Sequence, residues 1–320
     1  MSCGLKVLAS DVACHGIEQC RRVRRWYRVL ILSHAHVIRL WYLCCRLAVG
    51  HGYLLASGIP TLLGDIVQTV TAEGENYVLS LQTTRGLLKA LGDYRAGTPL
   101  PEAMSFFAEI DQLQSLAGIK ATRVEADWLN PQTYVAAFRQ RFLFLLGDME
   151  RRVQGAKSVA AGIQNHSMAS YRLSMAYSKL ILVSTFVDAV ASPASFSQEP
   201  LSNPQLLDVT RLLCHLFALT QLEGDAGEFM ESGAMQPQEM TMVRTCIESL
   251  LPQIRPHAVV LVDAFNFSDH SLNSALGRYD GRVYEALYQS AQLDPVNQAS
   301  DRVALTELLQ PIRETVKARL

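Results

Sequence analysis

The sequence predicts an all-α protein whose helices pack as a bundle. Apolar residues recur at helical spacing in several segments, and two of these segments open with Asn-Pro, a pair suited to the cap and first position of a helix. Segments of alternating polar and apolar residues joined by hairpin turns are scarce. The five predicted helices cover residues 130–146, 171–187, 203–219, 243–254 and 303–316.

Each predicted helix has its own signature in the sequence. In the first, Asn130 and Pro131 precede one apolar face, which comprises Tyr134, Phe138, Phe142, Leu145 and Leu146. The segment 171–187 is apolar on more than one face, which predicts a helix buried on several sides. Asn203 and Pro204 open the third helix.

The last two predicted helices are apolar stripes with less distinct starts. The stripe at 243–254 is expected to end near Pro252 and Pro256, because proline interrupts helical hydrogen bonding. The stripe at 303–316 combines Val303, Leu308, Leu309, Ile312 and Val316. Together the five helices favour one continuous helical architecture.

Composition excludes several classes of protein. The 320 residues are 49% hydrophobic and 18% charged, which suits a globular protein with a large core. Lys plus Arg minus Asp plus Glu is 29 − 30 = −1, so no global charge favours nucleic acid. The apolar stretches 26–45 and 47–64 contain charges, or glycines and a proline, and we expect no membrane span. Seven cysteines without a C-x-x-C pair indicate free thiols, with no metal site expected.

The residues most suggestive of chemistry lie between positions 50 and 85. Glycines beside His51 suit a turn that approaches a ligand, and Gly74 leaves the neighbouring Glu73 carboxylate unshielded. These residues alone leave alternatives open, because Glu73 could equally start a helix and His51 could be structural. The four motifs are GHGY at 50–53, SGIP at 57–60, AEGEN at 72–76 and LQTTR at 81–85.

These motifs, followed by VDAFNFSDHSLNSALGRYDGRVYEALY at 262–288 and DPVN at 294–297, resemble the C-terminal half of peroxisomal acyl-CoA oxidases. The resemblance covers about residues 50–320, with a weaker similarity at 11–22, and is nearest to the acyl-CoA oxidase-like proteins. It implies the two C-terminal helical domains of that family. The expected division is a divergent basic and apolar leader at 1–46, the end of the flavin-site helical domain at 47–125, and a C-terminal helical domain at 126–320.

The resemblance also implies chemistry. Glu73 occupies the position of the base that abstracts the α-proton of a fatty acyl-CoA, after which the β-hydrogen leaves as hydride to FAD. Molecular oxygen then reoxidises the flavin, giving hydrogen peroxide and trans-2-enoyl-CoA. Glu75 is expected to be polar scaffolding. Residues expected to line the flavin, in part across a dimer interface, are Gly50, His51, Gly52, Gly74 and Asn76.

Some features depart from the family and predict an alternative. Val49 stands where the family usually has glycine, residues 23–47 look inserted, and the N-terminal helical domain and β-barrel of the family have no counterpart. These features predict a truncated, catalytically inactive form that pairs with itself or with a full-length relative. A further alternative is a scaffold whose arginine-rich segment 21–28 meets a membrane surface. The final tripeptide, Ala318-Arg319-Leu320, predicts delivery to the peroxisome by an import receptor.

Overall fold

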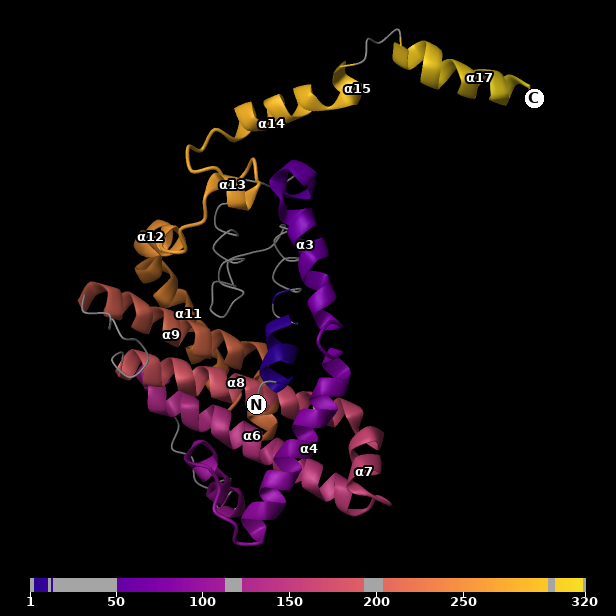
Figure 1. Cartoon of the computed structure of the whole chain (residues 1–320). Helices are drawn as coiled ribbons and strands as arrows, with labels where there is room; N and C mark the ends of the chain where they lie inside the picture. The colour runs from indigo at the N-terminus through magenta and orange to yellow at the C-terminus, as the bar shows by residue number, and fades with distance from the viewer. Residues whose placement is uncertain are drawn as a thin grey trace.

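The computed structural model describes residues 3–10, 13, 51–112, 123–192, 204–298 and 303–318 (Figure 1). Every regular element that these residues form is a helix, which confirms the predicted fold class. Several sequence features lie outside the described residues. These are Val49, Gly50, the arginine-rich segment 21–28, the inserted segment 23–47, and Arg319 with Leu320.

The first half of the chain forms a short N-terminal helix at residues 3–10, two long helices and several short ones. The elements, α-helical or tighter 3₁₀ turns, are η1 (His51–Tyr53), η2 (Leu55–Ser57), α3 (Ile59–Val67), η3 (Gln68–Val70), α4 (Asn76–Arg95), η4 (Glu102–Gln112), η5 (Glu125–Leu129), α6 (Pro131–Gln154) and α7 (Val159–Asn165). Helix α4 was absent from the sequence prediction.

The second half begins with the longest helix and ends in a series of short ones. Its elements are α8 (Ser167–Ala191), α9 (Pro204–Gly224), α10 (Ala226–Glu231), α11 (Glu239–Ile254), η7 (Arg255–His257), α12 (Ala258–Asp263), α13 (Asp269–Leu272), α14 (Val283–Leu293), α15 (Pro295–Gln298), η8 (Ala304–Leu309, a π-helix) and α17 (Gln310–Lys317).

Helices α4, α6, α8, α9 and α11 form the bundle (Figure 1). Helix α8 lies at its centre and packs against α4, α6 and α9, while α11 packs on α9. The core is built from aliphatic and aromatic side chains withdrawn from water. The largest fully buried aromatic side chains are Trp128, Tyr134, Tyr177, Phe107, Phe138, Phe142 and Phe229.

The predicted start of α6 is confirmed, whereas α8 and α11 begin at Ser167 and Glu239, four residues before their predicted starts. Asn130 caps α6, since its side-chain oxygen accepts a hydrogen bond from the Gln132 backbone N–H at 3.0 Å. Helix α8 buries residues on all sides, as its composition predicts. Helix α11 continues through Pro252 and ends at Ile254, two residues later than the proline; Pro256 then lies in η7.

Within the described residues, α8 has the length and apolar composition of a membrane-crossing helix. Half of its most apolar window is buried inside the bundle. Its neighbours α4, α6 and α9 account for this composition, because a helix covered on several sides needs apolar residues around its circumference.

The described residues of 283–318, here called the arm, depart from the expected packing. Helices α14 and α17 bury none of their described side chains, and the arm extends away from the bundle (Figure 1, yellow end). Ile312 is 61% exposed and Val316 is 53% exposed. The segment 303–316 is therefore helical as predicted, but the expectation that its apolar stripe packs in the bundle is wrong. Periodicity identifies a helical face without saying what covers it.

Candidate functional site

The turn between η3 and α4, residues 71–76, holds the predicted base in an unusual backbone conformation. Glu73 has φ of 57° and Gly74 has φ of 104°, two successive residues in the positive-φ region. A left-handed conformation costs a non-glycine residue about 1–2 kcal/mol. At Gly74 a Cβ would also lie 3.0 Å from Leu79 Cδ2. Both the positive φ and this close contact therefore favour glycine at position 74. This backbone leaves the Glu73 side chain exposed at the surface of the turn.

The neighbouring carboxylate has a different task. Glu75 is the N-cap of α4, and its Oε2 accepts a hydrogen bond from the Val78 backbone N–H at 3.0 Å. The carboxylate that starts the helix is therefore Glu75, which agrees with its predicted scaffolding role. Glu73 lies two residues before that cap, outside the helix. The helix-starting alternative considered for Glu73 thus applies to Glu75.

Lys6 and Ser10, on the N-terminal helix, bind the turn from the other side. Lys6 Nζ donates hydrogen bonds to Gly74 O at 2.6 Å, to Asn76 Oδ1 at 2.9 Å and to Val70 O at 3.3 Å. Asn76 Nδ2 donates to Ser10 Oγ at 2.8 Å. Sequence reasoning missed both residues. Their four-residue spacing places them on one helical face, which is the only sequence signal that could have suggested a shared role.

The N-terminal helix packs closely on the bundle. Val7 and Leu8 form a small buried cluster with Leu79 of α4 and Met175 of α8. A Cβ at Gly4 would lie 2.7 Å from Ser178 Oγ, so the backbone approaches α8 at a distance that only glycine permits without a shift. This packing fixes the position from which Lys6 reaches the turn.

His51 and Gly52 belong to a second group, in η1 before α3. The His51 ring meets the Tyr284 ring edge-on, with centroids 5.9 Å apart and planes at 85°. Gly52 is buried, and its carbonyl accepts a hydrogen bond from Ser57 Oγ at 3.2 Å. The loop after α13 anchors this group, because Ser274 Oγ donates to Ser57 O at 2.6 Å.

The structure thus separates the predicted flavin contacts into two groups at opposite ends of α3 and η3. Helix α3 has nine residues and a length of about 13 Å at 1.5 Å per residue. Gly74 and Asn76 lie together after this stretch, whereas His51 and Gly52 lie before it. Among the described residues His51 keeps its ring nitrogens without a hydrogen-bond partner, whereas the Asn76 amide is bonded to Lys6 and Ser10.

The RYDG motif at residues 278–281 forms a turn. Arg278 Nε donates to Asp280 Oδ1 at 3.0 Å, and the same oxygen accepts from the Arg282 backbone N–H at 3.0 Å. These bonds from Arg278 and Arg282 hold the pKa of Asp280 at about 2. Gly281 completes the turn with φ of 69°.

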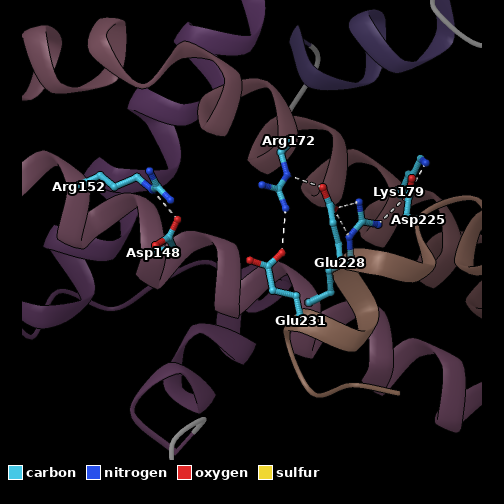
Figure 2. Close-up of polar contacts among 8 residues, drawn as sticks. Asp148, Arg152, Arg172, Lys179, Asp225, Glu228 and Glu231 are labelled. Carbon is cyan, nitrogen blue, oxygen red and sulfur yellow. Dashed lines mark hydrogen bonds and ion pairs between the residues drawn. The ribbon is translucent and has the colours of Figure 1, made fainter. Parts of the chain in front are cut away.

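A cluster of ion pairs joins α6, α8 and α10 inside the bundle (Figure 2). Buried Arg141 donates from Nε to Glu228 Oε2 at 2.8 Å and pairs with Asp225 Oδ2 at 2.8 Å. Two more cations complete the cluster. Arg172 binds Glu228 and Glu231, and Lys179 binds Asp225. Three cations therefore face three carboxylates, an arrangement that stabilises the packing of the helices and leaves no unpaired acid or base within the cluster for chemistry.

A buried group around Cys214 is chemically inert. Tyr134 Oη lies 3.7 Å from Cys214 Sγ and 3.4 Å from His215 Nδ1. Burial raises the pKa of the Cys214 thiol to about 11, raises the pKa of Tyr134, and lowers the pKa of His215. The thiol is protonated at neutral pH and is a poor nucleophile. His215 is half-buried beside this cluster.

The bundle has the architecture of the C-terminal helical domains found in acyl-CoA oxidases. The profile of the acyl-CoA oxidase family matches residues 130–314, and that of the acyl-CoA oxidase C-alpha1 domain matches residues 33–88. The chain belongs to the acyl-CoA oxidase family.

Similar proteins agree with that assignment. The chain is 31% identical over 310 residues to peroxisomal acyl-coenzyme A oxidase 1 of Arabidopsis thaliana, and the match covers 97% of this chain and 42% of the relative. It is 32% identical to peroxisomal acyl-coenzyme A oxidase 2 of Oryctolagus cuniculus, over 100% of this chain and 43% of the relative. The chain therefore spans less than half the length of these curated relatives.

Solved structures show the same fold. Acyl-CoA oxidase 1 of Arabidopsis thaliana superimposes with a TM-score of 0.76 at 28% identity, covering 96% of this chain and 44% of the other. Acyl-CoA oxidase-2 of Caenorhabditis elegans, solved with FAD, ascaroside-CoA and ATP, gives 0.72 at 27% identity, covering 89% and 40%.

Proposed function

We propose that the chain acts in peroxisomal fatty-acid β-oxidation as an acyl-CoA oxidase, with Glu73 as the base that removes the α-proton of a fatty acyl-CoA. The observation that carries this proposal is the turn itself. Its Glu73 carboxylate is exposed, lies outside the helix that Glu75 caps, and is held on a backbone with φ of 57°. Strained backbone of this kind is concentrated at functional sites.

In the proposed reaction Glu73 takes the α-proton, and the electrons of the broken C–H bond enter the enolate of the thioester. When bound, FAD accepts the β-hydrogen as hydride and passes the two electrons to molecular oxygen, giving hydrogen peroxide. The product is the trans-2-enoyl-CoA. Loss of the α-proton requires the acyl chain to cover the carboxylate and exclude water from it, because desolvation strengthens the interaction of a base with its proton.

We assign the flavin contacts to two parts of the chain, with His51 and Gly52 in η1 and Gly74 beside the base. Gly50 lies outside the described residues, and its assignment rests on the resemblance alone. The buried Gly52 and the tight backbone at Gly74 support this assignment. The prediction that Asn76 contacts the flavin stays a prediction, since its amide is bonded within the chain. The Caenorhabditis elegans acyl-CoA oxidase-2 holds FAD and ascaroside-CoA, which supports the same cofactor and substrate class for this chain.

The exposed apolar side chains of the arm favour one alternative. In it, the chain is a non-catalytic helical partner that forms a homodimer or pairs with a full-length relative. Light scattering of the purified chain, alone and mixed with a full-length acyl-CoA oxidase, measures this association directly. Association without flavin binding and without chemistry would favour the alternative over the oxidase.

The proposed base is tested by two measurements on the same sample. Addition of FAD is followed by the visible spectrum and by hydrogen peroxide release with a long-chain acyl-CoA. Exchange of the α-hydrogen of the acyl-CoA with deuterated water then reports the base without the redox step. We expect Glu73→Gln to lower both rates by at least about 100-fold. The control Glu285→Gln changes an exposed carboxylate on α14 and is expected to retain both.

Localisation is a separate proposal. The relatives are named as peroxisomal, and the terminal tripeptide at 318–320 suits a receptor that reads a free carboxyl end. A short extension after Leu320 should leave the protein in the cytosol. Continued entry into peroxisomes would contradict a role for this tripeptide.

A further inference from the structure

The strained conformation of Glu73 needs support that the turn does not supply alone. Gly74 adopts a positive φ freely, but a glutamate in the left-handed region persists only where its surroundings hold it. Glu75 satisfies the start of α4, but this bond lies entirely on the helix side of Glu73. On the other side, Thr71 and Ala72 bond back to Gln68 O, again without reaching across Glu73. The contacts that join the two sides come from the N-terminal helix, more than sixty residues earlier in the sequence.

The ammonium group of Lys6 bridges the two sides of Glu73. Its acceptors are Val70 O, three residues before Glu73, and Gly74 O and Asn76 Oδ1, one and three residues after it. An ammonium group has three N–H donors, and these three acceptors match that number. All three acceptors are neutral oxygens, and the positive charge of Lys6 strengthens each hydrogen bond. None of these three bonds uses a carboxylate as the acceptor.

Ser10 makes the support rigid. Its hydroxyl donates to Lys6 O at 2.9 Å, and it accepts from the buried Asn76 amide at 2.8 Å. Asn76 is thereby held by both residues of the N-terminal helix. The close backbone approach at Gly4 and the packing of Val7 and Leu8 hold that helix on the bundle.

We propose that Lys6 is a positioning residue for Glu73. Its ammonium group fixes the backbone on both sides of the glutamate. It thereby fixes the direction in which the Glu73 side chain projects from the turn. The structural part of this proposal stands on the hydrogen bonds alone; its consequence for catalysis rests on the proposed function of Glu73. A base that must meet one α-hydrogen loses rate when its direction varies, even if the substrate still binds.

The experiment compares Lys6→Met and Lys6→Arg with the parent chain and with Lys89→Met, which changes an exposed lysine on α4. Methionine keeps the length and apolar stem of lysine and removes its charge and donors. Amide hydrogen exchange, measured by mass spectrometry on peptides covering residues 70–80, reports the turn without flavin or substrate. Exchange of the α-hydrogen of an acyl-CoA, resolved into kcat and KM, reports the base.

In Lys6→Met we expect about tenfold faster amide exchange in the turn, with peptides from α6 unchanged. We expect kcat for α-hydrogen exchange to fall at least about tenfold, with KM changed less than about twofold. In Lys6→Arg, both the amide exchange rate and kcat should lie between those of Lys6→Met and the parent chain. Arginine keeps the positive charge, but its planar guanidinium group fits the three acceptors less well than the three N–H donors of an ammonium group. Lys89→Met should match the parent.

Two results would overturn the proposal. If amide exchange in the turn is unchanged in Lys6→Met, then Lys6 does not stabilise the turn. If amide exchange is faster but kcat is unchanged, then the stability of the turn does not affect the base. If Lys6→Met unfolds α6, the same measurement is made on Ser10→Ala. Unchanged amide exchange at residues 70–80 in that variant would equally show that the N-terminal helix does not stabilise the turn. If the parent chain fails to exchange α-hydrogens, the proposed function fails, while the amide exchange still decides whether Lys6 holds the turn.

Discussion

The bundle and the arm are both built from helices with apolar faces. Those faces are buried in the bundle and exposed to solvent in the arm. On α6 the stripe of Tyr134, Phe138 and Phe142 is completely buried. On α17 the equivalent stripe, with Ile312 and Val316, lies more than half in water. The same periodicity therefore accompanies both a core and an uncovered surface. What separates them is the presence of neighbouring helices, which is a property of the tertiary fold.

The largest expected difference between these regions concerns large apolar side chains. Phe142 packs against the rings of Phe106, Phe107 and Tyr177, so Phe142→Ala leaves a cavity and should lower the free energy of unfolding by about 3–5 kcal/mol. Ile312→Ala, on the arm, should change it by less than about 0.5 kcal/mol. Urea unfolding followed by circular dichroism measures both.

A loss of more than about 1 kcal/mol in Ile312→Ala would show that the arm is covered in solution, because an exposed side chain has little burial to lose. Repeating the unfolding measurement at several protein concentrations then distinguishes packing of the arm on a second chain from packing on the bundle of the same chain. A dependence on concentration identifies a second chain, and independence identifies the bundle of the same chain.

Charged side chains should give a smaller difference. Arg141→Met removes the buried cation and leaves Asp225 and Glu228 without one partner each, although Lys179 and Arg172 remain. We expect a loss of about 2–3 kcal/mol in the free energy of unfolding, below the full penalty for an uncompensated buried charge. The control is Arg313→Met on exposed α17, which should be close to neutral. Equal effects of the two substitutions would contradict a structural role for the ion-pair cluster.

The smallest effect concerns pH. Burial raises the pKa of Cys214 in the folded bundle to about 11, against an ordinary value of 9.0. The unfolded chain therefore loses this proton first, and between pH 9 and 11 it binds fewer protons than the folded chain, so stability falls as pH rises through that window. Cys214→Val should make the decline of the free energy of unfolding shallower. An identical slope in the variant would show that other groups control stability in alkali.

Local signals explain which parts of the molecule the sequence could predict. Asn130 and Pro131 act within one helical turn, so the start of α6 was predictable from adjacent residues. The EGEN motif likewise marks Glu73 and Gly74 as a special turn. Helix α4 was missed because glycines within it, such as Gly86 and Gly92, weaken the helical pattern that its packing against α8 restores.

Long-range contacts explain what could not be predicted. Lys6 meets Asn76 across seventy positions, and Arg141 meets Glu228 across eighty-seven. No spacing rule links such pairs, because their proximity is created by the packing of helices. In the same way, the exposure of the arm depends on which surfaces lie nearby and not on its own residues.

The bond between Lys6 and the turn also bears on how the protein folds. Joining residues 6 and 76 closes a loop of about seventy residues, and the entropy cost of such closure delays long-range contacts relative to local helices. The turn that carries Glu73 should therefore acquire its final shape after the helices have formed. On refolding, the helical signal would return first and the protection of the turn's amides from hydrogen exchange would return later, so that newly made chains pass through a helical stage before this turn is complete.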